Sequence, residues 1–230
     1  MILIALLAFG FVSSAQKKID AENFDKQLLS DLFLKKLNAY RVEHDAHVLE
    51  SNETLQTSAM DQANFNAHVL EAQSSRKKSK LATPELRAKQ LGGLYTEIGE
   101  VNLAIQTGVK LRLKGHKKKE VLNTYGAVAD ALFEQWTYSR QDKKYLLDDA
   151  YYQVGIGTAM HPVEKIVFIT VDLGVSPYIK IENLKYHKKA YRLNAYDKSY
   201  CRDLERKFEF LPQLMSGALF YKDGSIWFYF

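Results

Sequence analysis

The segment Trp136–Gly157 reads WTYSRQDKKYLLDDAYYQVGIG and joins a helical pattern to a strand pattern. Before it, apolar residues recur at helical spacing and form one continuous stripe: Val121, Tyr125, Val128, Leu132 and Trp136. After it, Val154–Ala159 and Ile166–Val171 have the apolar and β-branched composition of strands. This order, with a helix followed by consecutive strands, is the feature that constrains the fold class most.

Upstream of this segment the chain is predicted to be mainly helical. Apolar residues from Asp20 to Val42 fall at helical spacing, and Asn52 can cap a second helix. Thr83-Pro84-Glu85 starts a short helix that stops at Gly92-Gly93. Helices therefore precede the strands, which favours an α+β fold over alternating βαβ units.

Three segments resemble, in order, the CAP superfamily (cysteine-rich secretory proteins, antigen 5 and pathogenesis-related proteins) in its bacterial, cysteine-poor form. The first is the helix Leu55–Ala67, and the second is Tyr95–Leu103, YTEIGEVNL, which is similar to G-E-N-[IL] with Val101 inserted. The third, Trp136–Gly157, is similar without a gap to W-x-x-S-x-G-H-R-x-N-[IL]-L followed by H-[IV]-G-[IV]-G. The resemblance implies an SCP-like three-layer α-β-α sandwich with a cleft over its sheet.

The same resemblance implies four cleft positions. In family members that can bind zinc, these positions carry two His and two acidic residues, or three His and one acidic residue. Glu100 matches the acid of G-E-N, whereas Asp142 and Gln153 stand where the pattern has His. The remaining His belongs near Glu71, and His68 lies a few residues too early for it. The family-equivalent cleft positions are Glu100, Asp142, Gln153 and Glu71.

This residue set is degenerate for metal binding and for catalysis. Zinc prefers imidazole or thiolate, and a Gln amide is a poor ligand, so we expect no metal and no cofactor. Glu100, Asp142 and Glu71 could offer oxygen atoms to a hard cation, but weakly. Without an imidazole general base, no catalytic residue is predicted. The simplest interpretation of Glu100 and Asp142 is that they are helix-end or loop acids bonded to backbone N–H groups.

The function predicted from these observations is an exported CAP-like binding or interaction domain with a non-catalytic cleft. The alternative is a hydrolase that uses Glu100 and Asp142 as paired carboxylates. The distance between the two acids separates the alternatives, because paired catalytic carboxylates lie about 5–9 Å apart across an open cleft.

Composition excludes several other classes of protein. The 230 residues are 47% hydrophobic and 26% charged with a net charge of +5, as in an ordinary globular protein. The single cysteine, Cys201, excludes an internal disulfide, and no P-loop or dinucleotide motif is present. His44 and His47 fit a polar turn, and His161 fits a hairpin loop.

Three basic runs could bind anionic glycans, lipid head groups or nucleic acid: Lys77–Lys80, Lys110–Lys119 and Lys185–Arg192. Because charge runs are usually solvated faces and the net charge is modest, no nucleic acid is expected. The expected partner is a lipid, glycan or protein outside the cytosol.

The N-terminus favours export. Met1–Val12 is an uncharged apolar run too short to cross a bilayer, and Ser13-Ser14-Ala15 suits signal peptidase, so cleavage is predicted after Ala15. A buried N-terminal helix is the alternative. No later segment is apolar for long enough to span a membrane. The protein is therefore expected to be secreted or periplasmic.

The predicted organisation is a signal peptide at 1–15, a CAP-like domain at 16–175 and a small β-rich C-terminal extension at 176–230. In the extension, Asp223-Gly224 lies between two aromatic runs and predicts a hairpin. Because the chain stops within the second run, either the sequence is a fragment of a longer protein or its last strand is paired.

Overall fold

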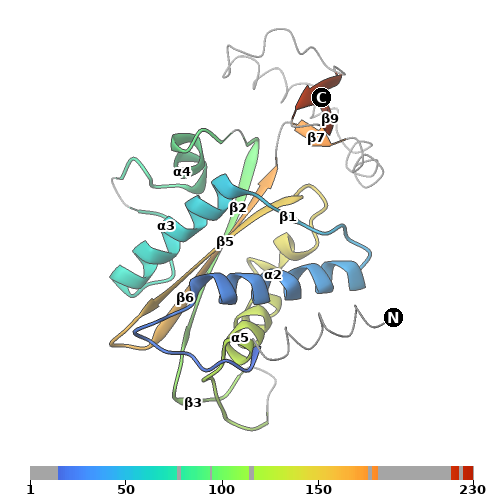
Figure 1. Cartoon of the computed structure of the whole chain (residues 1–230). Helices are drawn as coiled ribbons and strands as arrows, with labels where there is room; N and C mark the ends of the chain where they lie inside the picture. The colour runs from blue at the N-terminus through green and yellow to red at the C-terminus, as the bar shows by residue number, and fades with distance from the viewer. Residues whose placement is uncertain are drawn as a thin grey trace.

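The computed structural model describes residues 15–76, 79–93, 95–113, 117–175, 178–180, 219–222 and 225–229 (Figure 1). The larger elements are, in chain order, α2 (Lys26–Glu43), β1 (Glu50–Ser51), α3 (Glu53–Val69), α4 (Pro84–Gln90), β2 (Glu97–Gln106), α5 (Tyr125–Thr137), the 3₁₀ turn η1 (Lys143–Leu146), β5 (Gln153–His161) and β6 (Ile166–Val175). The fold is α+β, as the sequence predicted.

The main sheet is mixed and, within the described residues, has the order β1-β5-β6-β2. Strand β1 is parallel to β5, and the two long neighbours β5–β6 and β6–β2 are antiparallel. The pairing between β2 and β6 places Glu100 directly opposite Asp172 and Asn102 opposite Thr170. Strands β5 and β6 confirm and extend the two strands predicted from their composition.

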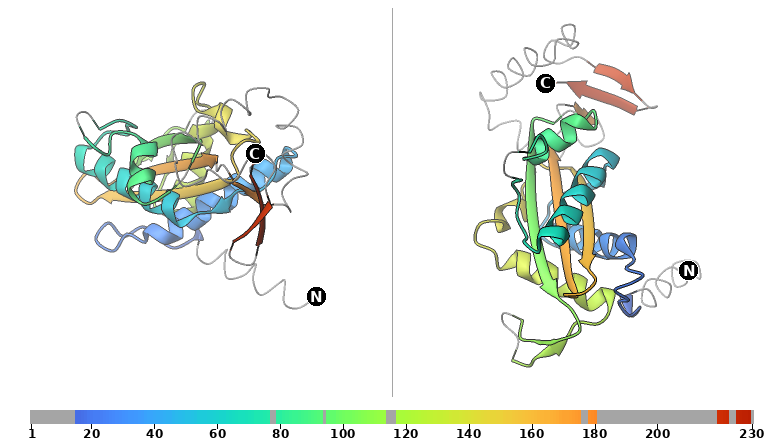
Figure 2. Two further views of the ribbon diagram at one scale, coloured as in Figure 1. Left: turned by 90° about the horizontal axis from the view of Figure 1, so that it is seen from above. Right: turned by 90° about the vertical axis from the view of Figure 1, so that its left-hand side faces the viewer.

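Helices cover both faces of the sheet (Figure 2). Because side chains alternate along a strand, Val154 and Ile156 of β5 join the large core beneath α2 and α5. Gly155 and Gly157 face α3 instead. A Cβ on Gly155 would lie 2.0 Å from the Leu55 carbonyl carbon, and one on Gly157 would lie 2.1 Å from that of Ala59. These glycines allow the α3 backbone to rest directly on β5.

Local capping chemistry sets where the helices begin. Asn52 and Thr83 cap α3 and α4 as predicted, since their side chains accept the N–H groups of Leu55 and Leu86. Two predicted starts were wrong. Helix α2 begins at Lys26 rather than near Asp20, because the Asp25 side chain caps it. Helix α5 begins after its cap Thr124, so Val121 lies outside the helix, in strand β4 (Glu120–Val121), and is 41% exposed.

The predicted stripe of α5 ends in the core at Trp136, which is fully buried. Its indole is stacked on Phe33 with ring centroids 6.1 Å apart, and its Nε1 donates to the Asp142 carbonyl oxygen at 3.0 Å. Trp136 therefore fixes the loop that follows α5.

A buried arginine fixes the connection that leads to β5. Arg41 of α2 is fully buried, and its guanidinium donates to four carbonyl oxygens, those of His47, Leu146, Asp148 and Tyr151. His47, expected in a polar turn, is also buried. Its Nε2 lies 2.8 Å from the Tyr151 carbonyl oxygen. Burial, reinforced by the charge of Arg41, lowers the pKa of His47.

Two smaller sheets complete the described structure. Strands β3 (Lys110–Leu111) and β4 form a hairpin, whereas β7 (Tyr178–Lys180), β8 (Leu219–Lys222) and β9 (Ser225–Tyr229) form a sheet in the order β7-β9-β8. Lys222 pairs with Ser225, which confirms the predicted hairpin, although Asp223-Gly224 lies outside the described residues. Strand β9 is paired on both sides, as one of the two expectations for the C-terminal run required.

The predicted signal peptide, except for Ala15, lies outside the described residues, as does Cys201. The segment after it is docked on the fold: Ile19 N–H donates to the Asn123 carbonyl oxygen, and Tyr125 N–H donates to that of Lys17. No helix among the described residues is long and apolar enough to cross a membrane.

Candidate functional site

The four family-equivalent positions lie in different environments. Glu100 belongs to β2 and is buried on the side of the sheet that faces α3, where its side chain is 3% exposed. Asp142 follows α5 and lines a pocket, and Gln153 starts β5. Glu71 is exposed on the loop after α3. Of these four residues, only Asp142 lines that pocket.

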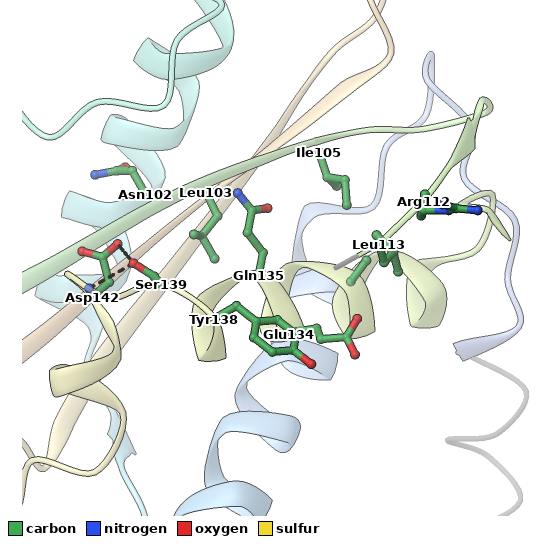
Figure 3. A pocket seen from close by; sticks show the side chains of 11 residues that line it. Asn102, Leu103, Ile105, Arg112, Leu113, Glu134, Gln135, Tyr138, Ser139 and Asp142 are labelled. Atoms are coloured by element: carbon green, nitrogen blue, oxygen red, sulfur yellow. Dashed lines mark hydrogen bonds between the residues drawn. The ribbon is translucent and has the colours of Figure 1, made fainter. Parts of the chain in front are cut away.

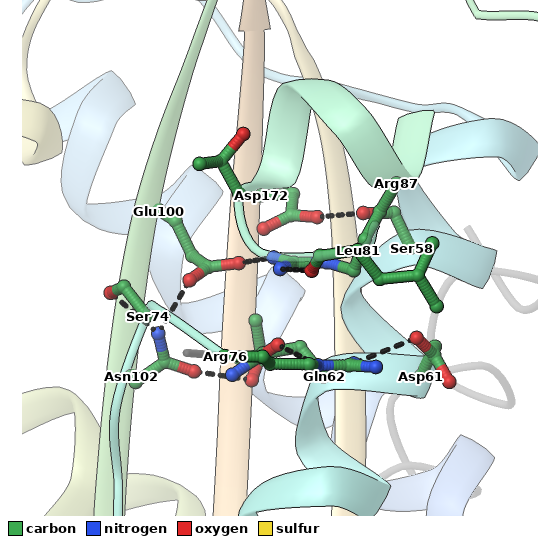
Figure 4. Close-up of polar contacts among 12 residues, drawn as sticks. Ser58, Asp61, Gln62, Ser74, Arg76, Leu81, Arg87, Glu100, Asn102 and Asp172 are labelled. Atoms are coloured by element: carbon green, nitrogen blue, oxygen red, sulfur yellow. Dashed lines mark hydrogen bonds and ion pairs between the residues drawn. The ribbon is translucent and has the colours of Figure 1, made fainter. Parts of the chain in front are cut away.

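Glu100 forms an ion pair with Arg87 of α4, whose side chain is 1% exposed (Figure 4). The other carboxylate oxygen accepts the Asn102 amide at 2.8 Å. The expectation that Glu100 bonds backbone N–H groups was wrong, because its carboxylate oxygens are bonded to the side chains of Arg87 and Asn102. The Arg87 guanidinium therefore occupies the space in front of the Glu100 carboxylate.

A second carboxylate, Asp172 of β6, lies on the same face and is fully buried. Burial raises the pKa of Asp172 to about 6, although the Arg87 charge and the hydrogen bond from Ser58, 2.6 Å long, act in the opposite direction. Burial likewise lowers the pKa of Arg87, and the charge of Asp172 opposes that change. Two buried carboxylates thus surround one buried cation.

Asn102 connects this cluster to α3 and to the loop that follows it. Its Oδ1 accepts from Asn66 at 2.8 Å and from Thr170 at 2.6 Å, and its Nδ2 donates to Ser74 at 3.0 Å. On the same loop, Arg76 is ion-paired with Asp61 of α3 at 2.7 Å. The network fixes the loop against the sheet, which is a structural role.

Gln153 and Asp142 also have local partners. The Gln153 Oε1 accepts from Asn52 at 3.4 Å, and Asn52 in turn accepts from the Tyr95 hydroxyl at 2.7 Å. The Asp142 carboxylate accepts a hydrogen bond from the Ser139 hydroxyl at 2.8 Å. The Asp142 N–H in turn donates to the Ser139 hydroxyl oxygen at 3.1 Å. Within the described ranges, no group of three or more His, Cys, Asp or Glu side chains is placed to hold a metal ion.

A pocket of about 470 Å³ lies along β2 (Figure 3). Of the four family-equivalent residues it contains only Asp142. Its wall consists of residues from β2, the segment after β3, α5 and the turn after α5: Asn102, Leu103, Ile105, Arg112, Leu113, Ala131, Glu134, Gln135, Tyr138, Ser139 and Asp142. The lining combines aliphatic side chains with polar and charged ones. Ligand-binding pockets use such a combination.

Sequence reasoning missed Arg87, Asp172 and most of the pocket. An arginine on a short polar helix usually lies in solvent, and nothing near Arg87 in the sequence indicates that Glu100 will bury it. Asp172 interrupts an apolar strand, which is a signal, because a buried acid requires a partner. The pocket depends on β2 being at the edge of the sheet, which the order of segments alone does not determine.

No protein-family model matches the sequence, and a search of curated proteins found no match. Solved structures do resemble the chain. An outer surface protein from Borrelia burgdorferi matches with a TM-score of 0.51 and 14% identity over 70% of this chain and 98% of that one. An extracellular protein containing an SCP domain from Bacillus anthracis matches with a TM-score of 0.49 and 15% identity, over 65% of this chain. A cysteine-rich secretory protein from Staphylococcus aureus matches with a TM-score of 0.43 and 11% identity, also over 65%.

The chain spans 41% of the Bacillus protein and 39% of the Staphylococcus protein. The chain therefore covers less than half of the length of each of these two proteins. At these identities the likeness concerns the fold alone.

Proposed function

We propose that this chain is an exported CAP-like, or SCP-like, domain of the three-layer α-β-α type that acts as a binding module. The observation that carries the proposal is the ion pair between Glu100 and Arg87, both almost completely buried. A carboxylate held in this way cannot take a proton from a substrate without breaking the pair. The degenerate cleft therefore serves stability, and binding is assigned to the pocket along β2.

A hydrolase built on Glu100 and Asp142 has little support in this geometry. Paired catalytic carboxylates face one cleft from about 5–9 Å apart. Glu100 points toward α4 on one side of the sheet, whereas Asp142 is bonded to Ser139 in the turn after α5, which packs on the other side. Among the described residues that line the pocket containing Asp142, none is a His.

The pocket supports binding through its size and its lining. Ligand pockets typically enclose about 300–1,000 Å³ and combine an apolar surface with a few polar groups. Here the apolar surface includes Leu103, Ile105 and Leu113, while Arg112 and Asp142 supply charges. The proposed partner is a lipid, glycan or protein outside the cytosol, which agrees with the predicted signal peptide.

Site-specific photo-crosslinking tests the proposal. A benzoylphenylalanine residue would replace Gln135 in the pocket wall or, as a control, the exposed Lys89 on α4, in the organism that encodes the protein. We expect a discrete adduct from position 135 that position 89 does not give. Equal adducts at both positions, or none at 135, would contradict the assignment of the pocket.

A hydrolysis assay addresses the alternative. The full chain would be incubated with peptide, ester and glycan substrates beside its Glu100→Gln and Asp142→Asn variants. We expect no turnover that either substitution reduces. Turnover lost in both variants, with folding retained, would establish the paired-carboxylate enzyme instead.

A further inference from the structure

We infer that the outer edge of β2 and the pocket beside it bind an extended peptide by strand addition, with acidic residues of the peptide at the β3–β4 hairpin. The inference rests on the proposed function and narrows it to a class of partner, an extended acidic polypeptide. It is carried by three observations: the hydrogen-bonding state of the β2 edge, the position of the pocket and the charge of the hairpin.

Strand β2 is an edge strand of ten residues. Among the described residues its backbone pairs only with β6. Next to the ladder, Thr107 N–H donates to the Lys165 carbonyl oxygen at 2.8 Å, so Thr107 faces the β6 side. Because antiparallel strands alternate, Asn102 and Ala104 direct their N–H and C=O groups to the outer edge. At the edge of a sheet, a row of backbone groups that no neighbouring strand pairs is a template for another strand.

The pocket lies where the side chains of an added strand would fall. Leu103 and Ile105 are two residues apart, so both point to the same face, and both line the pocket. Leu113 and Tyr138 extend its apolar surface (Figure 3). A peptide paired with the edge would place alternate side chains in this pocket, which is how strand addition gains specificity.

The charge of the hairpin favours an acidic partner. The exposed cations on its described residues are Lys110, Arg112, Lys117, Lys118 and Lys119. None of them forms a salt bridge with another described residue, and Arg112 makes only a hydrogen bond to the Lys117 carbonyl oxygen at 3.3 Å. The acids Glu134 and Asp142 lie on α5 and in the turn after it, across the pocket from β2 (Figure 3).

The geometry also sets the orientation of the peptide. Strand β2 runs from Glu97 toward Gln106, and the hairpin follows it directly. Antiparallel pairing is somewhat more stable than parallel pairing. A peptide antiparallel to β2 brings its N-terminal residues beside Arg112, so those residues are the acidic ones.

The test uses the full chain and a fluorescein-labelled, acetylated heptapeptide of sequence DDTVTVT, with binding followed by fluorescence anisotropy. We expect saturable binding that weakens at least tenfold in Arg112→Ala and that an excess of salt reduces. Ala104→Pro should abolish binding, because proline removes an outward N–H while leaving the β6 ladder intact. Lys89→Ala removes the same charge from α4 and should leave the affinity unchanged.

Modified peptides test the inference without altering the protein. A DDTVTVT peptide N-methylated at every backbone nitrogen has no N–H to donate from either edge and should not bind, and KKTVTVT should bind at least tenfold more weakly. Equal binding of the methylated peptide, equal weakening in Lys89→Ala, or no saturable binding of DDTVTVT would overturn strand addition. A dimer that Ala104→Pro dissociates would also overturn it, because a second copy would then occupy the edge. If a crosslink at position 135 persists while DDTVTVT fails, the pocket is a binding site for another ligand.

Discussion

Glu100 and Asp172 face each other across the pairing of β2 and β6, and Arg87 is the cation that both interact with. Glu100 is ion-paired with the guanidinium directly. Asp172 accepts a hydrogen bond from Ser58, and the guanidinium charge acts to lower the pKa of Asp172. The cluster is inside the protein, between α3, α4 and the sheet. Its effects therefore appear first in stability.

Replacement of Glu100 by Ala should destabilise the fold by about 3–5 kcal/mol, because it leaves the Arg87 guanidinium buried without its directly bonded carboxylate. Urea denaturation measures the change in the free energy of unfolding. Glu71→Ala is the matched control, since Glu71 is exposed, and it should change stability by no more than about 0.5 kcal/mol. Equal, small effects of the two substitutions would show that the buried ion pair does not form.

Replacement of Asp172 by Asn should make stability respond differently to pH. The pKa of Asp172 is raised from 3.8 to about 6 in the folded protein, so the folded state binds more protons than the unfolded state between these values. The contribution of Asp172 to stability is therefore greatest below about pH 4 and falls as the pH rises to 6. Relative to the parent, Asp172→Asn should gain roughly 3 kcal/mol between pH 4 and pH 7.

Asp25→Asn provides a control of opposite sign for that measurement. The hydrogen bond from Lys17, followed by that from the Leu28 N–H, lowers the pKa of Asp25. Its stabilising effect is present above the unfolded-state pKa and is lost as the pH falls through the folded value. The difference between Asp25→Asn and the parent should therefore shrink toward low pH. A difference that is constant with pH for Asp172→Asn would contradict the raised pKa.

The parts of the fold that could be predicted depend on short-range chemistry. Asn52 and Thr83 predict the starts of their helices, because a capping side chain bonds a backbone N–H only three residues further along the chain. Asp223-Gly224 predicts a hairpin because its turn chemistry is likewise local. Strand β2 was harder to predict from the sequence, because Glu100 and Asn102 are polar residues that face the buried side of the sheet. Their burial becomes intelligible only once Arg87 and Asn66 are seen beside them.

The candidate site could be predicted only in part. Aligning the sequence with a family pattern located Glu100 and Asp142 but gave no information about what surrounds them. The partner of Glu100 comes from α4, and the pocket containing Asp142 needs β2 to be an edge strand. Both are consequences of packing among distant segments.

We predict that the purified full chain contains far less than one equivalent of zinc. Within the described ranges, no group of three or more His, Cys, Asp or Glu side chains is placed to hold a metal ion, and the Glu100 carboxylate is paired with Arg87. Elemental analysis after purification in the presence of zinc measures the content. Stoichiometric zinc that disappears in Glu100→Gln would show that the cleft still binds metal.

Export is predicted to remove residues 1–15 and to leave Gln16 as the first residue. The new N-terminus would keep its contacts with the fold, since the backbone bonds made by Lys17 and Ile19 lie beyond the cleavage site. Mass spectrometry of the exported protein determines the mass of the mature chain. Recovery of intact Met1 on the protein in the cytosol would remove the localisation proposal.

The close packing of α3 on β5 gives the last prediction. Gly157→Ala should destabilise the protein by about 1–3 kcal/mol or more, because the added Cβ would lie 2.1 Å from the carbonyl carbon and oxygen of Ala59. Gly99→Ala should cost less, since the nearest atoms there, at 3.0 Å, belong to the side chains of Tyr145 and Tyr151. Urea denaturation of both variants gives the comparison.

A second substitution identifies which atoms cause the effect of Gly157→Ala. Ala59→Gly removes the Ala59 side chain but leaves the Ala59 carbonyl group, which is the obstructing part. It should therefore fail to restore the stability of Gly157→Ala, and should add its own cost because glycine is unfavourable within a helix by about 1 kcal/mol. If the double variant regains the parental stability, the α3 backbone does not rest on β5 as described, and the glycines of the VGIG segment serve another purpose.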